Sequence, residues 1–252
     1  MFLEKWYADV CDGDRVEILY LANLKLGPTL FGYDGGITLS GRATGTVVPG
    51  GVQLPREVDG AVVWPSADPR GVERMRWAGA CPREIPLWRH GRQLLTWNPL
   101  VLNGPVSGNG LSPSARGYVE KLSLNFSPWR LGLERLMWGR FCGVRHSLVW
   151  IEWEGRHPMR LALLDGRECR LREVSLDHVD CAESMLRLTQ RRALVREPMS
   201  EGALRSLTLP GRLATLQFFR GLESKWFARG ELGLGGNDAD SGHAVFEEVV
   251  WP

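Results

Sequence analysis

Glu120 is a side chain whose position in the sequence favours acid chemistry. It occupies every second position together with Tyr118, Leu122 and Leu124. Because successive side chains point to opposite faces of a β-strand, these four lie on one face. A carboxyl group on an apolar face has its pKa raised by desolvation, which suits a proton donor to an alkene. The structural alternative is that Glu120 pairs with an arginine at a sheet edge, because buried acids also occur in ion pairs.

Glu152 is a second acid in an apolar strand. It shares a face with Leu148 and Trp150, and the other face of the same segment is formed by Val149, Ile151 and Trp153. Such a strand is expected between a barrel interior and a packed interface. Glu152 then orients water or balances charge, or it has a purely structural role as the bidentate partner of Arg140.

Four tryptophans are candidates for the wall of a ligand pocket: Trp97, Trp129, Trp138 and Trp150. The faces of aromatic rings stabilise cations by ~0.5–2 kcal/mol per contact. That is too little for catalysis by itself, so these rings would assist an acid rather than replace it. The alternative is that they are ordinary core residues, which is the common role of aromatic side chains in strands.

Other catalytic signatures are missing from the sequence. The five histidines are scattered, and the only local cluster, Asp177-His178-x-Asp180, is typical of a solvated turn. The segment from Asp238 to Gly242 begins like a calcium loop but lacks the glycine and glutamate at the required spacing. There is no phosphate-binding loop, no G-x-G-x-x-G and no G-x-S-x-G. We therefore predict neither a cofactor nor a metal site.

The composition indicates an ordinary globular protein. Hydrophobic residues make up 44% and charged residues 24% of the 252 residues, and the net charge of +2 gives no long-range field, so nucleic acid is not an expected partner. The five cysteines are odd in number and widely spaced, which favours free thiols in a reducing compartment. With no signal peptide and no apolar run of membrane-spanning length, the sequence predicts a soluble cytoplasmic protein without a transmembrane segment.

The spacing of strand-forming residues and turn signals predicts an all-β, antiparallel fold. Residues 102–115 are rich in Gly, Pro, Ser and Asn, so we expect a boundary there, with an N-terminal β-domain at 1–112 and a C-terminal β-domain at 113–252. One short helix is predicted at 210–221, where apolar residues recur at helical spacing between a proline and a glycine. The expected strands are 6–10, 16–26, 37–48, 94–97, 118–126, 136–142, 147–153, 159–164, 168–174, 186–194, 226–234 and 244–251.

Three segments carry a family resemblance. Arg116-Gly-Tyr-Val-Glu-Lys121, Trp138-Gly-Arg-Phe141 and Leu148-Val-Trp-Ile-Glu-Trp153 resemble strands of the lipocalin-like hydratase and cyclase group, which includes carotenoid 1,2-hydratases, AttH-like proteins and tocopherol cyclases. The resemblance implies two lipocalin-like antiparallel β-barrels packed together, with an apolar pocket for an isoprenoid or polyene-like molecule. The chain departs from the group's pattern before Tyr118, where Arg116 and Ala115 stand and the second glycine is missing.

The resulting hypothesis is that the chain binds an apolar small molecule (an isoprenoid, polyene or polycyclic compound) in a barrel pocket. Acid-assisted hydration, cyclisation or isomerisation would follow, with Glu120 as proton donor and Glu152 and Tyr118 as further catalytic residues. Arg140 joins the four tryptophans as a ligand-binding candidate. The alternatives are a non-catalytic lipophile carrier of the same fold, a pericyclase-type cyclase without acid catalysis, and a protein-interaction module with exposed aromatic patches.

Overall fold

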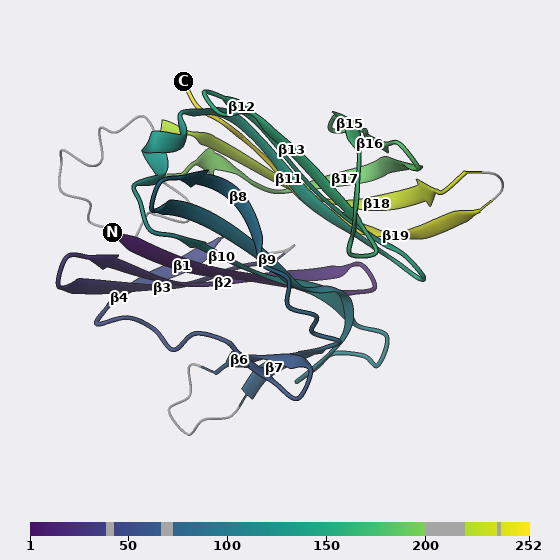
Figure 1. The fold of residues 1–252 in the computed structure, drawn as a ribbon. Coiled ribbons are helices and arrows are strands. Elements are labelled where there is room, and N and C mark those ends of the chain that lie inside the picture. Colours follow the sequence, from purple (N-terminus) through teal and green to yellow (C-terminus); the bar gives the residue numbers. More distant parts are fainter. Residues whose placement is uncertain (39–42, 67–72, 200–219, 236–237) are drawn as a thin grey trace. The chain divides into compact units, whose positions relative to one another are not determined.

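The computed structural model describes residues 1–38, 43–66, 73–199, 220–235 and 238–252 (Figure 1). They are almost entirely antiparallel β-strand, with a short 3-10 helix, η1 (Pro128–Leu131). The predicted all-β fold is therefore confirmed. The helix predicted at 210–221 falls almost wholly within 200–219, outside the described residues. In the described part of the chain, no helix is long and apolar enough to span a membrane.

The described residues divide into two compact units, one from Met1 to Arg130 and one from Leu131 to Pro252. The division lies after the boundary expected at 112/113. The reason is the strand at Arg116–Leu124, which pairs with the first strand of the chain and so belongs to the first unit. The segment rich in Gly and Pro before it connects two neighbouring strands of one sheet rather than two domains.

The first unit is built on a ten-stranded sheet with the order β4-β3-β2-β1-β10-β9-β7-β6-β5, and β8 pairs with β9. Its first and last strands, β1 and β10, are neighbours at the centre of this order. The strands are β1 (Phe2–Asp12), β2 (Arg15–Leu26), β3 (Thr29–Thr38), β4 (Thr44–Pro49), β5 (Arg56–Val58), β6 (Ala61–Pro65), β7 (Glu73–Ala78), β8 (Ile85–His90), β9 (Gln93–Gly108) and β10 (Arg116–Leu124).

The second unit is a nine-stranded sheet with the order β14-β13-β12-β11-β19-β18-β17-β16-β15. Its first and last strands, β11 and β19, are again paired. The strands are β11 (Leu133–Gly143), β12 (Ser147–Gly155), β13 (Met159–Leu164), β14 (Arg167–Cys169), β15 (Leu171–Val174), β16 (His178–Cys181), β17 (Ser184–Pro198), β18 (Leu222–Gly233) and β19 (Ala239–Val250).

Both sheets follow the same path, apart from the extra strand β8. In each, the two end strands are consecutive in the chain: residues 50–55 separate β4 from β5, and Arg170 alone separates β14 from β15. Because a short connection must bring the ends of the sheet close together, each sheet curls back on itself. In the first unit the Asn23 amide fixes this connection, donating to the Val52 carbonyl at 2.9 Å and accepting from the Val52 N–H at 2.8 Å.

The core of the first unit lies on one face of its sheet. Trp6, Ala8 and Val10 alternate along β1 and pack with Trp64 and Trp77, whose rings lie 5.9 Å apart. Alternation therefore turns the residues between them, Tyr7 and Asp9, to the opposite face.

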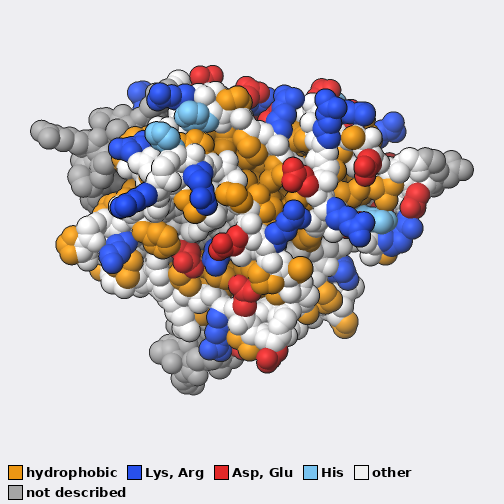
Figure 2. Space-filling view, in the orientation of Figure 1, with side chains coloured by type: hydrophobic (Ala, Val, Ile, Leu, Met, Phe, Trp, Pro, Cys, Tyr) orange, Lys and Arg blue, Asp and Glu red, His pale blue; other side chains and the backbone are white. Residues whose placement is uncertain are grey.

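The core of the second unit is aromatic and depends on a glycine. Trp226 stacks on Phe246 at 5.3 Å, and the Trp150 ring lies 6.5 Å from Phe246. A Cβ at Gly139 would meet Trp150 Cζ2 at 2.2 Å and Phe246 Cβ at 2.5 Å, so only glycine lets these rings lie against β11. On the face shown in Figure 2, basic and acidic side chains are intermixed, in keeping with the small net charge.

Candidate functional site

All four tyrosines of the chain lie on one face of the first sheet, opposite its tryptophan core. The register pairs Tyr7 with Tyr20, Asp9 with Tyr118, and Ala22 with Tyr33, so these side chains share a face across β10, β1, β2 and β3. The ring of Tyr7 lies 5.4 Å from Tyr20 and 6.1 Å from Tyr118. We call the surface formed by Tyr118, Tyr7, Tyr20 and Tyr33 the tyrosine face.

Two tyrosine–carboxyl pairs cross at the centre of the tyrosine face. The Tyr7 hydroxyl donates to Asp9 Oδ2 at 2.9 Å, and the Tyr118 hydroxyl donates to Glu120 Oε2 at 2.8 Å. Because β1 and β10 run antiparallel, Tyr7 lies beside Glu120 and Asp9 lies beside Tyr118. Two acids and two phenols are thus gathered on neighbouring strands, and Asp9 is fully buried while Glu120 is 8% exposed.

Glu120 accepts a second hydrogen bond at the same oxygen. The Trp97 indole N–H on β9 donates to Glu120 Oε2 at 2.5 Å. Two donors therefore converge on one carboxyl oxygen. The two bonds also fix the carboxyl group in one orientation, as a positioned acid or base requires.

Gly117 explains how β10 comes this close to its neighbours. A Cβ at this position would lie 2.0 Å from the Asp9 carbonyl oxygen and 2.6 Å from Trp77 Nε1, which itself donates to that oxygen at 2.9 Å. The glycine of the Gly-Tyr-Val-Glu segment is therefore required by this close approach, while the tyrosine and glutamate supply the polar groups.

Tyr118 is a phenol that keeps its proton. Its complete burial, followed by the negative charge and hydrogen bond of Glu120, raises its pKa well above the ordinary value for tyrosine. At neutral pH the hydroxyl therefore stays protonated and can donate a hydrogen bond to a carboxylate or to a ligand oxygen. Lys5 extends the polar character of this face, with its ammonium 5.3 Å from the centre of the Tyr20 ring.

Glu152, the second acid expected from the sequence, belongs to the second unit. It is buried on β12 and forms an ion pair with Arg160, its cross-strand neighbour on β13. The pairing with Arg140 does not occur, because Glu152 faces Met137 while Arg140 lies on the other face of β11. Arg140 is fully buried, and its Nη1 donates to the His243 carbonyl at 3.3 Å.

The four candidate tryptophans have different surroundings. Trp97 donates a hydrogen bond to Glu120. Trp129 lies on η1 and is 40% exposed, whereas Trp150 packs in the core of the second unit. Trp138 is adjacent in the strand to Gly139, which faces Trp150, so Trp138 and Trp150 point to opposite faces of their sheet. These two rings therefore do not form one wall.

Tyr7 and Asp9 are the site residues that sequence reasoning missed. A signal for them exists, since Tyr7-Ala-Asp9 and Tyr118-Val-Glu120 are both tyrosine-x-acid segments within strands. Their meaning depends on the antiparallel register of β1 and β10, which joins residues more than one hundred positions apart. Among the described residues, no group of three or more His, Cys, Asp or Glu side chains is placed to hold a metal ion.

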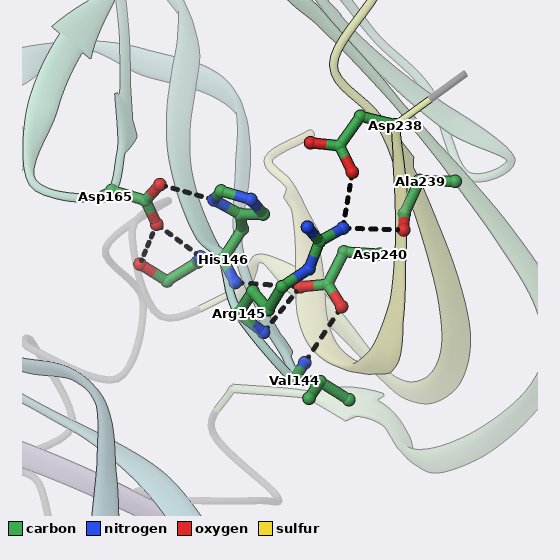
Figure 3. A network of polar contacts seen from close by, with 8 residues as sticks. Val144, Arg145, His146, Asp165, Asp238, Ala239 and Asp240 are labelled. Atoms are coloured by element: carbon green, nitrogen blue, oxygen red, sulfur yellow. Dashed lines mark hydrogen bonds and ion pairs between the residues drawn. The ribbon is translucent and has the colours of Figure 1, made fainter.

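A second polar network lies at the turn between β11 and β12 (Figure 3). The buried carboxylate of Asp240 accepts the backbone N–H groups of Val144, Arg145 and His146 at 3.1, 2.9 and 2.8 Å. Burial raises the pKa of Asp240, but these three backbone donors outweigh it and the pKa is lowered. His146 Nδ1 also lies 2.7 Å from Asp165 Oδ2. The network holds a turn and shows no nucleophile, so we assign it to stability.

Replacing Asp240 by Asn is expected to destabilise the second unit by roughly 1–3 kcal/mol at pH 7, since the buried N–H donors lose their anionic partner. A folded-state pKa below the unfolded value of ~3.9 contributes stability that is present above that value and lost as pH falls through the folded pKa. The difference in the free energy of unfolding between wild type and D240N, measured by urea unfolding, should therefore become smaller below about pH 4. The exposed neighbour variant D238N serves as control, and an equal loss there would contradict this role.

Comparison with known proteins reveals similarity of fold. No protein-family model and no curated protein matches the sequence. Among solved structures, CghA, which has also been solved with Sch210972, aligns with a TM-score of 0.57 at 12% identity over 99% of this chain and 88% of its own. Kievitone hydratase from Nectria haematococca gives 0.51 at 9% identity over 98% and 88%. A putative AttH from Nitrosomonas europaea gives 0.53 at 11% identity over 97% and 92%. The lipocalin-like all-β fold expected from the motif strands is thereby confirmed.

Proposed function

We propose that the protein binds a small molecule against the tyrosine face and transfers a proton to it, in a hydration, cyclisation or isomerisation. The observation that carries this proposal is the crossed pair Tyr7–Asp9 and Tyr118–Glu120, two buried acids that each accept a phenol hydrogen bond. The fold shared with a protein named as a hydratase supports the reaction class. The ligand class is an apolar isoprenoid, polyene or polycyclic compound, for which the aromatic rings around the acids supply contact area.

In this proposal Glu120 is the acid and Asp9 the base. Hydration of an alkene needs a proton on one carbon, attack of water on the resulting cation, and removal of a proton from the added water. In its protonated form Glu120 supplies the first proton, and Asp9, on the neighbouring strand, accepts the last. Tyr118 and Trp97 hold the Glu120 carboxyl in position through its Oε2, and the aromatic rings stabilise positive charge in the transition state.

Cyclisation and isomerisation use the same groups with the order of steps changed. Loss of a proton from the cation to Asp9, rather than capture of water, gives an isomerised or cyclised alkene.

We also propose a cytoplasmic location, which is supported by five cysteines that are all free thiols.

The test is the identification of a ligand followed by its fate. Native mass spectrometry of the protein purified from its own host should reveal a bound lipophile, and that compound should quench tryptophan fluorescence saturably when titrated back. Incubation with catalytic amounts of protein should then convert it, with the mass of one water added for a hydratase and no change in mass for an isomerase or cyclase. A ligand returned unchanged indicates the carrier alternative, and the absence of saturable binding contradicts the proposal.

A further inference from the structure

The second sheet has a seam where its two ends meet. β14 and β15 are the end strands of the order, yet Arg170 alone separates them in the chain. The seam is bridged on one side by the Ala182 N–H, which donates to the Arg170 carbonyl at 2.9 Å. Two cysteines flank it: Cys169 is the last residue of β14, and Cys181 is the last residue of β16, the partner of β15.

The strand register brings the two cysteines near one another. Cys181 pairs with Leu171, two residues beyond Cys169, and both cysteines pack against the same core cluster of the second unit. Each side chain is close enough to shift the pKa of the other. Cys181 is 2% exposed, whereas Cys169 is half-buried and within reach of a small solute. Cys181 also lines an open surface hollow of about 600 Å³, formed by Asp180–Met185 and Gly233–Gly235.

The surroundings make the two thiols chemically unequal. A hydrogen bond from Cys181 lowers the pKa of Cys169, and a backbone hydrogen bond at Leu164 lowers it further. Burial and the carboxylates of Glu183 and Glu168 act in the opposite direction, but the pKa is lowered overall. The same hydrogen bond, together with burial, raises the pKa of Cys181. Cys169 is thus the better nucleophile and Cys181 the thiol beside it that can complete a disulfide.

We propose that Cys169 and Cys181 form a reversible disulfide across the seam when the protein meets hydrogen peroxide. The Cys169 thiolate attacks one peroxide oxygen, the O–O bond breaks, and hydroxide leaves, giving Cys169 sulfenic acid. The Cys181 sulfur then attacks Cys169 Sγ, the S–OH bond breaks, and the hydroxide released takes the Cys181 proton to form water. Two thiols and one peroxide give one disulfide and two waters, so two electrons pass from sulfur to oxygen.

The disulfide would join β14 to β16, strands that the sheet order places near opposite ends. It would add a covalent bond at the seam and reduce the freedom of the unfolded chain. We therefore expect the oxidised second unit to unfold at a higher temperature than the reduced one. This inference concerns the second unit and does not depend on the proposed catalytic function.

The experiment uses the full chain treated with hydrogen peroxide, alkylated under denaturing conditions and digested with trypsin. Cleavage after arginine places Cys169 in the peptide Glu168–Arg170 and Cys181 in Glu173–Arg187, so the bond appears as a cross-linked pair that dithiothreitol separates. In C181S, dimedone should trap Cys169 as sulfenic acid. The control C81S, which removes an exposed cysteine, should still form the cross-link.

The inference is overturned if both thiols remain open to alkylation after peroxide, if either pairs with another cysteine instead, or if Cys169 in the wild type proceeds to sulfinic acid without the cross-link. The peptide map of the wild type decides these outcomes even if a serine variant fails to fold.

Discussion

Replacing Glu120 by Gln is expected to lower turnover of the identified substrate by ~10²-fold or more, because general acid catalysis typically contributes 10²–10⁴-fold. Glutamine keeps the size of the side chain and an oxygen that accepts the bonds of Tyr118 and Trp97, but it has no acidic proton. Ligand affinity should change little, so the loss should appear in kcat rather than KM. Steady-state kinetics and ligand titration of wild type and E120Q measure the two effects separately.

Glu4 provides a matched control for this experiment. Its Oε1 accepts the indole N–H of Trp6 at 2.9 Å, so E4Q changes the same kind of tryptophan–carboxylate contact. Glu4 stands three positions before Tyr7 on β1, so its side chain lies on the face opposite the tyrosine face. Turnover should therefore survive in E4Q. Full turnover in E120Q would remove Glu120 as the acid, and Glu152→Gln would be tested next. Loss of folding stability without a kinetic effect would make Glu120 a structural residue.

Replacing Trp150 by Ala is expected to destabilise the protein by ~3–5 kcal/mol, the usual cost of truncating a buried tryptophan. The side chain is 1% exposed and packs between Gly139 and Phe246, so its loss leaves a cavity that the strands cannot close. Its indole N–H has no hydrogen-bond partner among the described residues, so the loss is one of packing. Urea unfolding followed by circular dichroism measures the change.

Trp129→Ala is the control for this variant, because Trp129 is 40% exposed and its removal should alter stability by no more than about 0.5 kcal/mol. A W150A protein that is as stable as W129A but has lost ligand binding would restore Trp150 to the pocket wall expected from the sequence. A large loss of stability with intact binding would confirm its role as core.

Local alternation predicted the strands and part of the site. Tyr118 and Glu120 were expected on one face of one strand, and the hydrogen bond between them agrees with that expectation. The face itself was expected to be apolar. It instead carries Tyr7 and Asp9, because the composition of a sheet face depends on which strands are neighbours, and alternation within one strand says nothing about its partners.

Strand pairing determines both the extent of the first unit and the surroundings of the tryptophans. The Gly- and Pro-rich segment 102–115 has the composition of a linker, but β9 continues to Gly108 and turns back into β10 within one sheet. Trp138 and Trp150 are close in the sequence, and both stand at even-numbered positions. They nevertheless occupy paired strands whose register places them on opposite faces. In both cases long-range strand pairing outweighed local composition.

The pairing of first and last strands in each unit has a mechanical consequence. Leu3 at the start of β1 lies opposite Leu124 at the end of β10, and Arg135 near the start of β11 lies opposite Val250 at the end of β19. A force that pulls the two ends of a unit apart therefore acts on the outermost hydrogen bonds of one antiparallel ladder, at right angles to the strands. Those bonds break one after another, as in a zipper, rather than together in shear, so each unit yields to tension at low force from its own termini.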